Sequence, residues 1–307
     1  MEQLDVIVIG AGPAGLAAGI NSASYDLNTL IIEQKIPGGC AAEIPFLENY
    51  PGYVERITGS ELISNMVRQC ERSGADIKQL ESAVELCFDD DRRVVRTDKS
   101  SYESKAVIIA TGRSCKLLGV PGEEEYRGRG VSYCAVCDGH FFKEKRVVVV
   151  GSDSRATEVA TYLSGLASDV FLLCPEEEIC AEKILLIYME SERVNVLKKA
   201  ELIEIKGDVN VGSVIIADSD TGETREIYTD GVFFQLEDIP NSNIAKNAGI
   251  AVDDNDYIIV NNHGRTNIDG VYAIGDVTTS PIKMVVTAAA QAAIATMDML
   301  GYISESM

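Results

Sequence analysis

The sequence predicts an α/β fold of two doubly wound Rossmann-like domains, the second inserted into the first. Three observations support this prediction. The chain has 307 residues, enough for about two domains of roughly 100–200 residues each. Two stretches, beginning near residues 5 and 146, each alternate a short apolar strand, a glycine-containing turn, a helix and another strand. A further strand at 271–274 ends in Gly-Asp, so we expect the first domain to resume after about residue 242.

The first alternation contains a glycine-rich turn. Residues 5–9 form a short β-branched apolar run, and residues 10–15 read Gly-x-Gly-x-x-Gly. An alanine-rich helical stretch follows, and a second strand at 29–32 ends at Glu33. A strand, glycine turn, helix, strand and acid within ~30 residues form the context in which this motif predicts dinucleotide binding.

Each residue of this turn has a physical role. Gly10 permits the tight turn, Gly12 lets the backbone approach a pyrophosphate, and Gly15 lets the helix pack on the sheet. The N–H groups at the start of the helix would face the phosphates, and Glu33 would accept hydrogen bonds from a ribose. The alternative is a glycine turn with a structural role alone.

The second alternation predicts a second mononucleotide-binding fold. A buried strand at 146–150 leads into a turn at 151–156, a helix at about 157–163 and the next strand at 170–173. No low-complexity linker marks either junction. The predicted boundaries are residues 1–114 and 243–307 for the first domain, and residues 115–242 for the second.

The composition of the chain disfavours some classes of binding partner. The chain has 27 Lys and Arg against 48 Asp and Glu, a net charge of −21, which disfavours binding to nucleic acid or to an anionic membrane. Its short basic clusters at 92–93, 143–146 and 198–199 are interpreted as solvated edges. No apolar run approaches the ~20 residues of a membrane span. The acidic start does not resemble a secretory signal, so we expect a cytoplasmic protein.

One pair of cysteines stands out among the eight. Cys134 and Cys137 form a C-x-x-C motif, which in a cytoplasmic protein indicates redox or metal chemistry. At the start of a helix such a motif lowers the pKa of one thiol. A zinc site needs two further ligands, and the histidines are only His140 and His263. We therefore favour a redox pair, and we expect the neighbouring His140 to lie beside the redox helix.

Taken together, the motifs resemble those of the low-molecular-weight thioredoxin reductases. The similarity covers nearly the whole chain, and the order and spacing of its motifs are specific. The motifs are residues 10–15, 48–52, 110–112, 134–139 (Cys-Ala-Val-Cys-Asp-Gly), 265–272 and 275–276. The resemblance implies a homodimeric enzyme that reduces the disulfide of thioredoxin or a similar small protein by thiol–disulfide exchange.

The resemblance also implies a tightly bound FAD in the first domain. Glu33 would bind the ribose, and Asp276 would face the ribityl chain and pyrophosphate. Cys40 stands where the family usually has Gln, and the pair at 283–284, Lys-Met, replaces Arg-Gln, so the electronics of the flavin are expected to differ. The candidate cofactor residues are Gly10, Gly12, Pro13, Ala14, Gly15, Glu33, Gln34, Gly39, Cys40, Asn49, Thr111, Gly112, Gly275, Asp276, Met284 and Val285.

Three catalytic residues follow from the same resemblance. Cys137 would lie next to the flavin, and Cys134 would attack the substrate disulfide. Asp138 would be the acid and base that manages the proton of the flavin-proximal thiol.

The second domain departs from the family wherever the usual donor, NADPH, is bound. Asp153 occupies the turn where a pyrophosphate needs bare backbone. Glu176, Pro175 and Cys180 stand at the family's three arginines, and residues 236–238, Leu-Glu-Asp, replace Ile-Gly-His. Each lost phosphate contact costs about 1.5–3 kcal/mol. Two like charges ~4 Å apart add about 4 kcal/mol at an effective dielectric of 20.

These departures predict an enzyme that does not use NADPH. Members of the family that work without pyridine nucleotide take electrons from reduced ferredoxin or a reduced deazaflavin coenzyme, and the chain resembles the deazaflavin-using type most. One alternative is an NADPH-dependent thioredoxin reductase with an unusual nucleotide site, rebuilt around Arg155. Another is a flavin-binding redox sensor without turnover. A ferredoxin–NADP reductase-like flavoprotein is disfavoured because such proteins lack the C-x-x-C.

Overall fold

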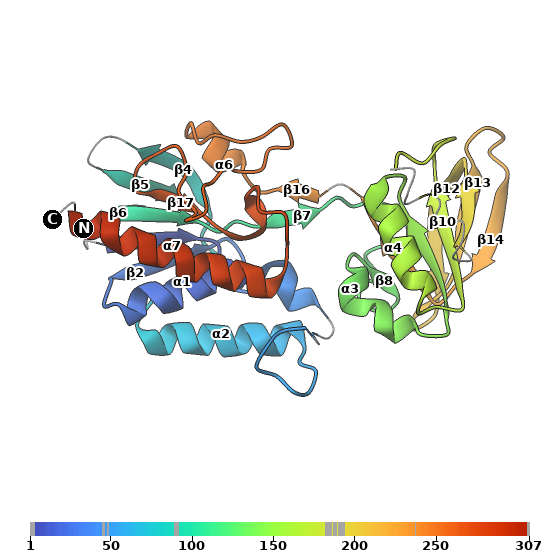
Figure 1. The fold of residues 1–307 in the computed structure, drawn as a ribbon, viewed down its shortest axis with the longest axis horizontal. Helices are drawn as coiled ribbons and strands as arrows, with labels where there is room; N and C mark the ends of the chain where they lie inside the picture. The colour runs from blue at the N-terminus through green and yellow to red at the C-terminus, as the bar shows by residue number, and fades with distance from the viewer. Residues whose placement is uncertain are drawn as a thin grey trace. The chain divides into compact units, whose positions relative to one another are not determined.

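The computed structural model divides into two units (Figure 1). Unit 1 comprises residues Met1–Ser114 and Ile239–Met307, and unit 2 comprises Cys115–Asp238. The structure describes residues 4–44, 47, 49–88, 92–181, 186, 189, 194–236 and 238–305. Each unit contains a largely parallel sheet with helices packed on it, which confirms the predicted α/β class.

The sheet of unit 1 has seven strands. Its central strands are parallel, and two further strands extend it in antiparallel fashion. Its order is β3 (Asp76–Gln79), β2 (Thr29–Glu33), β1 (Leu4–Ile9), β6 (Ser101–Ile109), β5 (Arg93–Thr97) and β4 (Ala83–Phe88), with β17 (Val271–Ala273) paired to β6. The carboxyl ends of β2, β1, β6 and β17 therefore meet at one edge of the sheet, where open α/β sheets bind ligands.

Alternation along β1 supplies both cores of unit 1. Val6 and Val8 face one cluster, which the helices α1 (Pro13–Ser24), α2 (Gly59–Ser73) and α7 (Val285–Glu305) cover. Ile7 and Ile9 face the other cluster, which β4, β5 and the segment around α6 (Asn243–Asn247) cover (Figure 1). Side chains of successive strand residues point to opposite faces, so one apolar strand can serve two layers.

Unit 2 combines a parallel sheet with an antiparallel one. The parallel sheet is packed against α4 (Ser154–Ser164) on one face and against the antiparallel sheet on the other. The parallel order is β11 (Val194–Lys198), β10 (Asp169–Cys174), β9 (Arg146–Val150), β15 (Gly231–Phe234) and β8 (Val131–Ser132). The antiparallel strands are β12 (Ala200–Gly207), β13 (Val211–Asp218) and β14 (Thr224–Tyr228).

The chain re-enters unit 1 at Ile239, four residues before the predicted 243. At the two crossings, β7 (Arg113–Cys115) pairs with β16 (Asp238–Pro240). Asn241 then binds to the first segment: its N–H donates to Gly112 O at 3.0 Å, and its Nδ2 donates to Thr111 O at 2.9 Å. These tertiary hydrogen bonds, which leave no trace in local sequence, assign residues 239–242 to unit 1. Within the described ranges, no helix is both long enough and apolar enough to span a membrane.

Candidate active site

The turn between β1 and α1 has the conformation that its glycines predict. Gly10 has φ +103°, and a Cβ there would lie 2.4 Å from Ala110 O. A Cβ on Gly15 would lie 1.8 Å from Gly10 O, so no larger residue fits. Gly12 differs, because a Cβ there would meet nothing within 4 Å. The chain thus leaves open space at Gly12 and closes it at the other two glycines.

The start of α1 is free to receive an anion. Gly12 is its N-cap and makes no side-chain capping hydrogen bond, and Pro13 follows it. The N–H groups of a first helical turn have no partners within the helix. They also lie at the positive end of the helix dipole, where phosphates bind.

Glu33, the last residue of β2, is oriented toward this turn. Only 9% of its surface is exposed. Its Oε2 accepts the N–H of Ala11 at 2.7 Å, and its Oε1 accepts the N–H of Lys35 at 2.8 Å. Each carboxylate oxygen has a further lone pair, which could accept a hydrogen bond from a sugar hydroxyl.

The strands β6 and β17 bring two more predicted groups to the same edge. Thr111 and Gly112 follow β6, and Gly275 and Asp276 lie in the short 3-10 helix η3 (Gly275–Val277) after β17. A Cβ on Gly275 would lie 2.8 Å from Ala14 Cβ, which places η3 against the start of α1. The structure therefore brings together groups more than 250 residues apart in sequence.

Other predicted cofactor residues lie near the glycine turn or near Asp276. A Cβ on Gly39 would lie 3.5 Å from Gly12 Cα, and the Cys40 thiol donates to Arg113 O at 3.2 Å. Arg113 Nε lies 3.2 Å from Asp276 Oδ2. Lys283, which precedes Met284 and Val285 at the start of α7, donates to Asp276 O at 3.1 Å.

Two predicted residues are less closely tied to the group of residues around the glycine turn and Asp276. Gln34 and Asn49 are exposed, and among the described residues neither side chain has a hydrogen bond to the group. Glu48, part of the same predicted motif as Asn49, lies outside the described residues.

The corresponding turn of unit 2 is already capped from within. Asp153 is the N-cap of α4, and its Oδ1 accepts the N–H of Ala156 at 2.9 Å. A carboxylate thus occupies the helix N-terminus that is open in α1. The segment after β10 also reaches this turn, because Cys180 N donates to Ser152 O at 2.7 Å.

The charges around this second turn are unfavourable for a phosphate. Arg155 Nε lies 3.4 Å from Asp153 Oδ2, so its positive charge is partly compensated. Glu176 is exposed in the loop after β10. Glu237, which belongs to the predicted departure at 236–238, lies outside the described residues.

Cys134 and Cys137 form a disulfide at the start of the short helix α3 (Ala135–Asp138). Their Cα atoms are 5.3 Å apart. Cys134 is the N-cap of α3, and its Sγ accepts the N–H of Cys137 at 3.2 Å. Between them, Val136 has 62% of its surface exposed. An N–H that points at sulfur and a helix N-terminus both favour a thiolate when the bond is reduced.

Asp138 ends this helix in a buried position, with 9% of its surface exposed. Burial raises its pKa above the usual value for an aspartate, and a hydrogen bond from Ser132 opposes that rise. Ser132 Oγ lies 2.6 Å from Asp138 Oδ2. Ser132 is not among the residues predicted from the sequence; its only signal is its position two residues before the first cysteine.

Tyr133 anchors the backbone just before the disulfide. Its hydroxyl donates to Oε1 of the buried Glu123 at 2.7 Å, and its ring stacks on Phe234 with centroids 5.4 Å apart. The first cysteine of the pair therefore follows a residue that is fixed at both ends of its side chain.

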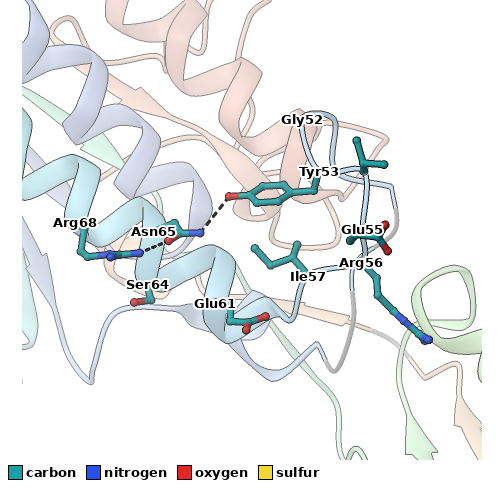
Figure 2. A pocket seen from close by; sticks show the side chains of 10 residues that line it. Gly52, Tyr53, Glu55, Arg56, Ile57, Glu61, Ser64, Asn65 and Arg68 are labelled. Atoms are coloured by element: carbon teal, nitrogen blue, oxygen red, sulfur yellow. Dashed lines mark hydrogen bonds between the residues drawn. The ribbon is translucent and has the colours of Figure 1, made fainter.

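An open groove in unit 1 contains none of the predicted catalytic or cofactor residues. It lies between the loop at 52–57 and α2, and Figure 2 shows Tyr53 directed toward Asn65 on that helix. Asn65 Nδ2 donates to the Tyr53 hydroxyl at 3.2 Å. The lining residues are Gly52, Tyr53, Val54, Glu55, Arg56, Ile57, Glu61, Ser64, Asn65 and Arg68.

Comparison with known proteins identifies the family. The sequence profile of the family described as pyridine nucleotide-disulphide oxidoreductase matches residues 4–292. The chain belongs to this family. Thioredoxin reductase from Bacillus subtilis strain 168 is 40% identical to it over 308 aligned residues, which cover 98% of this chain and 95% of that protein. Thioredoxin reductase from Treponema pallidum strain Nichols is 37% identical, with 97% of both chains covered.

Solved structures agree. The crystal structure of thioredoxin reductase from Streptococcus pyogenes MGAS5005 superposes with a TM-score of 0.94 at 36% identity, and the match covers 99% of each chain. Within the pyridine nucleotide-disulphide oxidoreductases, the chain is therefore a member of the low-molecular-weight thioredoxin reductases, as its motifs predicted.

Burial of Asp138 in this family member predicts a dependence of stability on pH. The pKa of Asp138 is higher in the folded chain than in the unfolded chain. The unfolded chain releases this proton first as the pH rises, so folding stability falls from about pH 4 up to the folded-state pKa. Asp138→Asn removes this loss of stability, because the amide of asparagine does not ionise. We expect Asp138→Asn to gain stability relative to wild type between pH 4 and pH 8 in urea unfolding. Parallel pH profiles for the two proteins would contradict this assignment.

Proposed function

We propose that the chain is an FAD-dependent, thioredoxin reductase-like disulfide oxidoreductase. It passes two electrons through Cys134 and Cys137 to the disulfide of thioredoxin or a similar protein. The observation that carries the proposal is the Cys134–Cys137 disulfide at the start of α3, with the buried carboxyl of Asp138 on the same short helix.

The residues of unit 1 fit an FAD. The uncapped start of α1 and the open space at Gly12 suit a pyrophosphate, and Glu33 at the end of β2 suits the ribose. Asp276, against the start of α1, would face the ribityl chain. When bound, FAD supplies a two-electron store between the donor and the disulfide.

In the reduced protein, Cys134 is the attacking thiolate. Its Sγ attacks one sulfur of the partner's disulfide, which breaks that bond and forms a mixed disulfide while one partner thiolate leaves. Cys137 then attacks the Sγ of Cys134, which re-forms the Cys134–Cys137 disulfide and releases the second partner thiol. Two electrons leave the chain as its dithiol is oxidised, and the partner's disulfide is reduced.

Asp138 handles the proton in this exchange. A carboxyl whose pKa is raised by burial keeps its proton to higher pH than an ordinary aspartate and can give it to a neighbouring thiolate. It takes the proton back when Cys137 becomes the nucleophile. The assignment of Cys137 as the flavin-proximal sulfur follows the family resemblance.

We infer that the electron donor is a reduced deazaflavin coenzyme or reduced ferredoxin rather than NADPH. The Asp153 carboxylate caps α4 where a dinucleotide pyrophosphate would bind, and Arg155 lies against that carboxylate. The exposed Glu176 adds negative charge in the loop after β10. The competing proposal, an NADPH-dependent enzyme with an unusual nucleotide site, requires this cap to be displaced.

We further propose a homodimer, as the resemblance to the family implies. Helix α7 supports this proposal because it exposes apolar side chains on one face. Ile294 and Met297, one helical turn apart, have 46% and 55% of their surfaces exposed. A second copy of the chain is the expected occupant of this face.

A transfer experiment tests the proposed function. The flavin-loaded protein is reduced photochemically under argon, freed of reductant and mixed with oxidised thioredoxin. We expect two new thiols on thioredoxin for each protein dithiol that is oxidised. If thioredoxin stays oxidised while Cys134 and Cys137 stay reduced, the alternative of a redox sensor without turnover replaces the proposal.

A further inference from the structure

We propose that Ser132 is a positioning residue for the disulfide exchange: its hydroxyl holds the Asp138 carboxyl by one oxygen and leaves the other oxygen to exchange the proton. The inference rests on the proposed function and adds a residue to it.

The geometry around Ser132 places three groups on one hydroxyl. Ser132 is the last residue of β8, which pairs with β15, and 5% of its surface is exposed. Its Oγ lies 2.6 Å from Asp138 Oδ2 and accepts the N–H of Cys134 at 3.1 Å. The Cys134 carbonyl oxygen lies farther away, at 3.4 Å. A strand end thus connects the backbone of the attacking cysteine to the buried acid.

The donors and acceptors present fix the direction of these hydrogen bonds. A serine hydroxyl has one proton to donate, and here the shortest contact is with Asp138 Oδ2. The N–H of Cys134 can only donate, so it takes a lone pair of Oγ. Oδ2 is therefore an acceptor in both protonation states of Asp138, and the acid proton belongs on Oδ1.

The second oxygen of Asp138 has the environment that this role needs. Oδ1 is buried, and among the described residues no group forms a hydrogen bond with it. Buried polar atoms in folded proteins usually have a partner, so an unpartnered carboxyl oxygen beside a redox disulfide calls for a function. Oδ1 is the oxygen that carries the proton to a thiolate and receives it again.

The proton balance of the step closes with the solvent. When the Cys134–Cys137 disulfide takes up two electrons from the donor, Asp138 Oδ1 gives its proton to Cys137, and Cys134 stays as the thiolate that attacks the partner's disulfide. Asp138 takes this proton back when Cys137 attacks the Sγ of Cys134, and the two partner thiolates that leave take up two protons from the solvent. Ser132 keeps its own proton throughout and sets only where the carboxyl points.

Unit 2 offers a matched control for this serine. Ser213 on β13 is also buried, with 6% of its surface exposed, and its Oγ lies 2.6 Å from Glu226 Oε1. Both buried serines therefore form a hydrogen bond of the same length to a carboxylate, although Glu226 itself is exposed. Only Ser132 connects to the redox helix.

The test compares Ser132→Ala, Ser132→Thr and Ser213→Ala in single-turnover reduction of thioredoxin by the reduced protein from pH 5 to pH 9. The titratable groups near Asp138 in sequence and packing are the two cysteines, His140 and Tyr162 of α4, which packs beside Gly139. We expect Ser132→Ala to slow the transfer at least about tenfold, which is a part of the roughly 10²–10⁴-fold that general acid–base catalysis contributes. The limb of the pH profile that belongs to Asp138 should move to higher pH. The hydrogen bond from Ser132 lowers the pKa of Asp138, so its loss in Ser132→Ala raises that pKa. Ser132→Thr restores rate and profile, and Ser213→Ala changes neither.

A pH profile of Ser132→Ala that superimposes on wild type overturns the inference and leaves the proposed function intact. Equal losses in Ser132→Ala and Ser132→Thr also overturn it, because a threonine keeps the hydroxyl. Should Ser132→Ala fail to fold, Ser132→Gly carries the same comparison. A wild-type protein that leaves thioredoxin oxidised overturns the proposed function, and this inference with it.

Discussion

Serine in place of Cys137 stops the reduction of protein disulfides, with an expected loss of about a thousandfold or more in steady-state rate. The reason is chemical. Cys134 still attacks the partner's disulfide, but a serine hydroxyl cannot displace the partner from the mixed disulfide. The variant should therefore accumulate a covalent adduct, which non-reducing gel electrophoresis detects and dithiothreitol releases.

Cys134→Ser and Cys180→Ser complete this experiment. Cys134→Ser removes the attacking sulfur, so it should lose the same activity without a trapped adduct. Cys180→Ser is the matched control, because Cys180 is an exposed free cysteine outside the redox helix and its loss should change little. Trapping by Cys134→Ser and not by Cys137→Ser would reverse the roles of the two sulfurs. Full activity in both variants would remove the disulfide from the mechanism.

Alanine at Gly12 and alanine at Gly15 have opposite expected effects. A Cβ at Gly12 meets nothing within 4 Å, so Gly12→Ala should fold normally and lose affinity for FAD by about tenfold or more, the equivalent of about 1.4 kcal/mol. A Cβ at Gly15 would lie 1.8 Å from Gly10 O, so Gly15→Ala should unfold unit 1 or destabilise it by about 3 kcal/mol or more. Flavin content after purification and thermal unfolding of the flavin-free protein separate the two effects.

Gly301→Ala serves as a control for the addition of a Cβ at an open glycine. Like Gly12, Gly301 has no positive φ and no neighbour within 4 Å of an added Cβ, so its substitution should leave the flavin content unchanged. Normal FAD affinity in Gly12→Ala would show that the pyrophosphate does not pass over Gly12. A fully stable Gly15→Ala would show that α1 does not pack on β1 as described.

The sequence predicts the glycine turns well because their causes are local. Gly15 is fixed by its contact with Gly10 O within one strand–turn–helix unit, and Glu33 follows the next strand at a regular distance. The C-x-x-C motif is local too, and it predicts that Cys134 and Cys137 act as a pair. The sequence shows Asp153 in the turn where a pyrophosphate needs bare backbone, and the structure adds that Asp153 caps α4.

What the sequence does not reveal depends on contacts between distant or irregular segments. Ser132 is six residues from Asp138 with no helical or strand period between them, and β8 and α3 bring the two together only in the fold. The return to unit 1 at Ile239 depends on Asn241, whose partners Thr111 and Gly112 lie at the end of β6, far away in the sequence. No local pattern encodes either arrangement.

The central claim is that electrons reach protein disulfides through Cys134 and Cys137 from a donor other than NADPH. The most direct test mixes the flavin-loaded protein and oxidised thioredoxin under argon with NADPH, reduced deazaflavin coenzyme or reduced ferredoxin in parallel. Visible flavin absorbance and thioredoxin thiols are recorded together. The account predicts that NADPH leaves the flavin oxidised at millimolar concentration, whereas reduced deazaflavin or ferredoxin bleaches it and thiols appear. Rapid bleaching by NADPH with concurrent reduction of thioredoxin would contradict it.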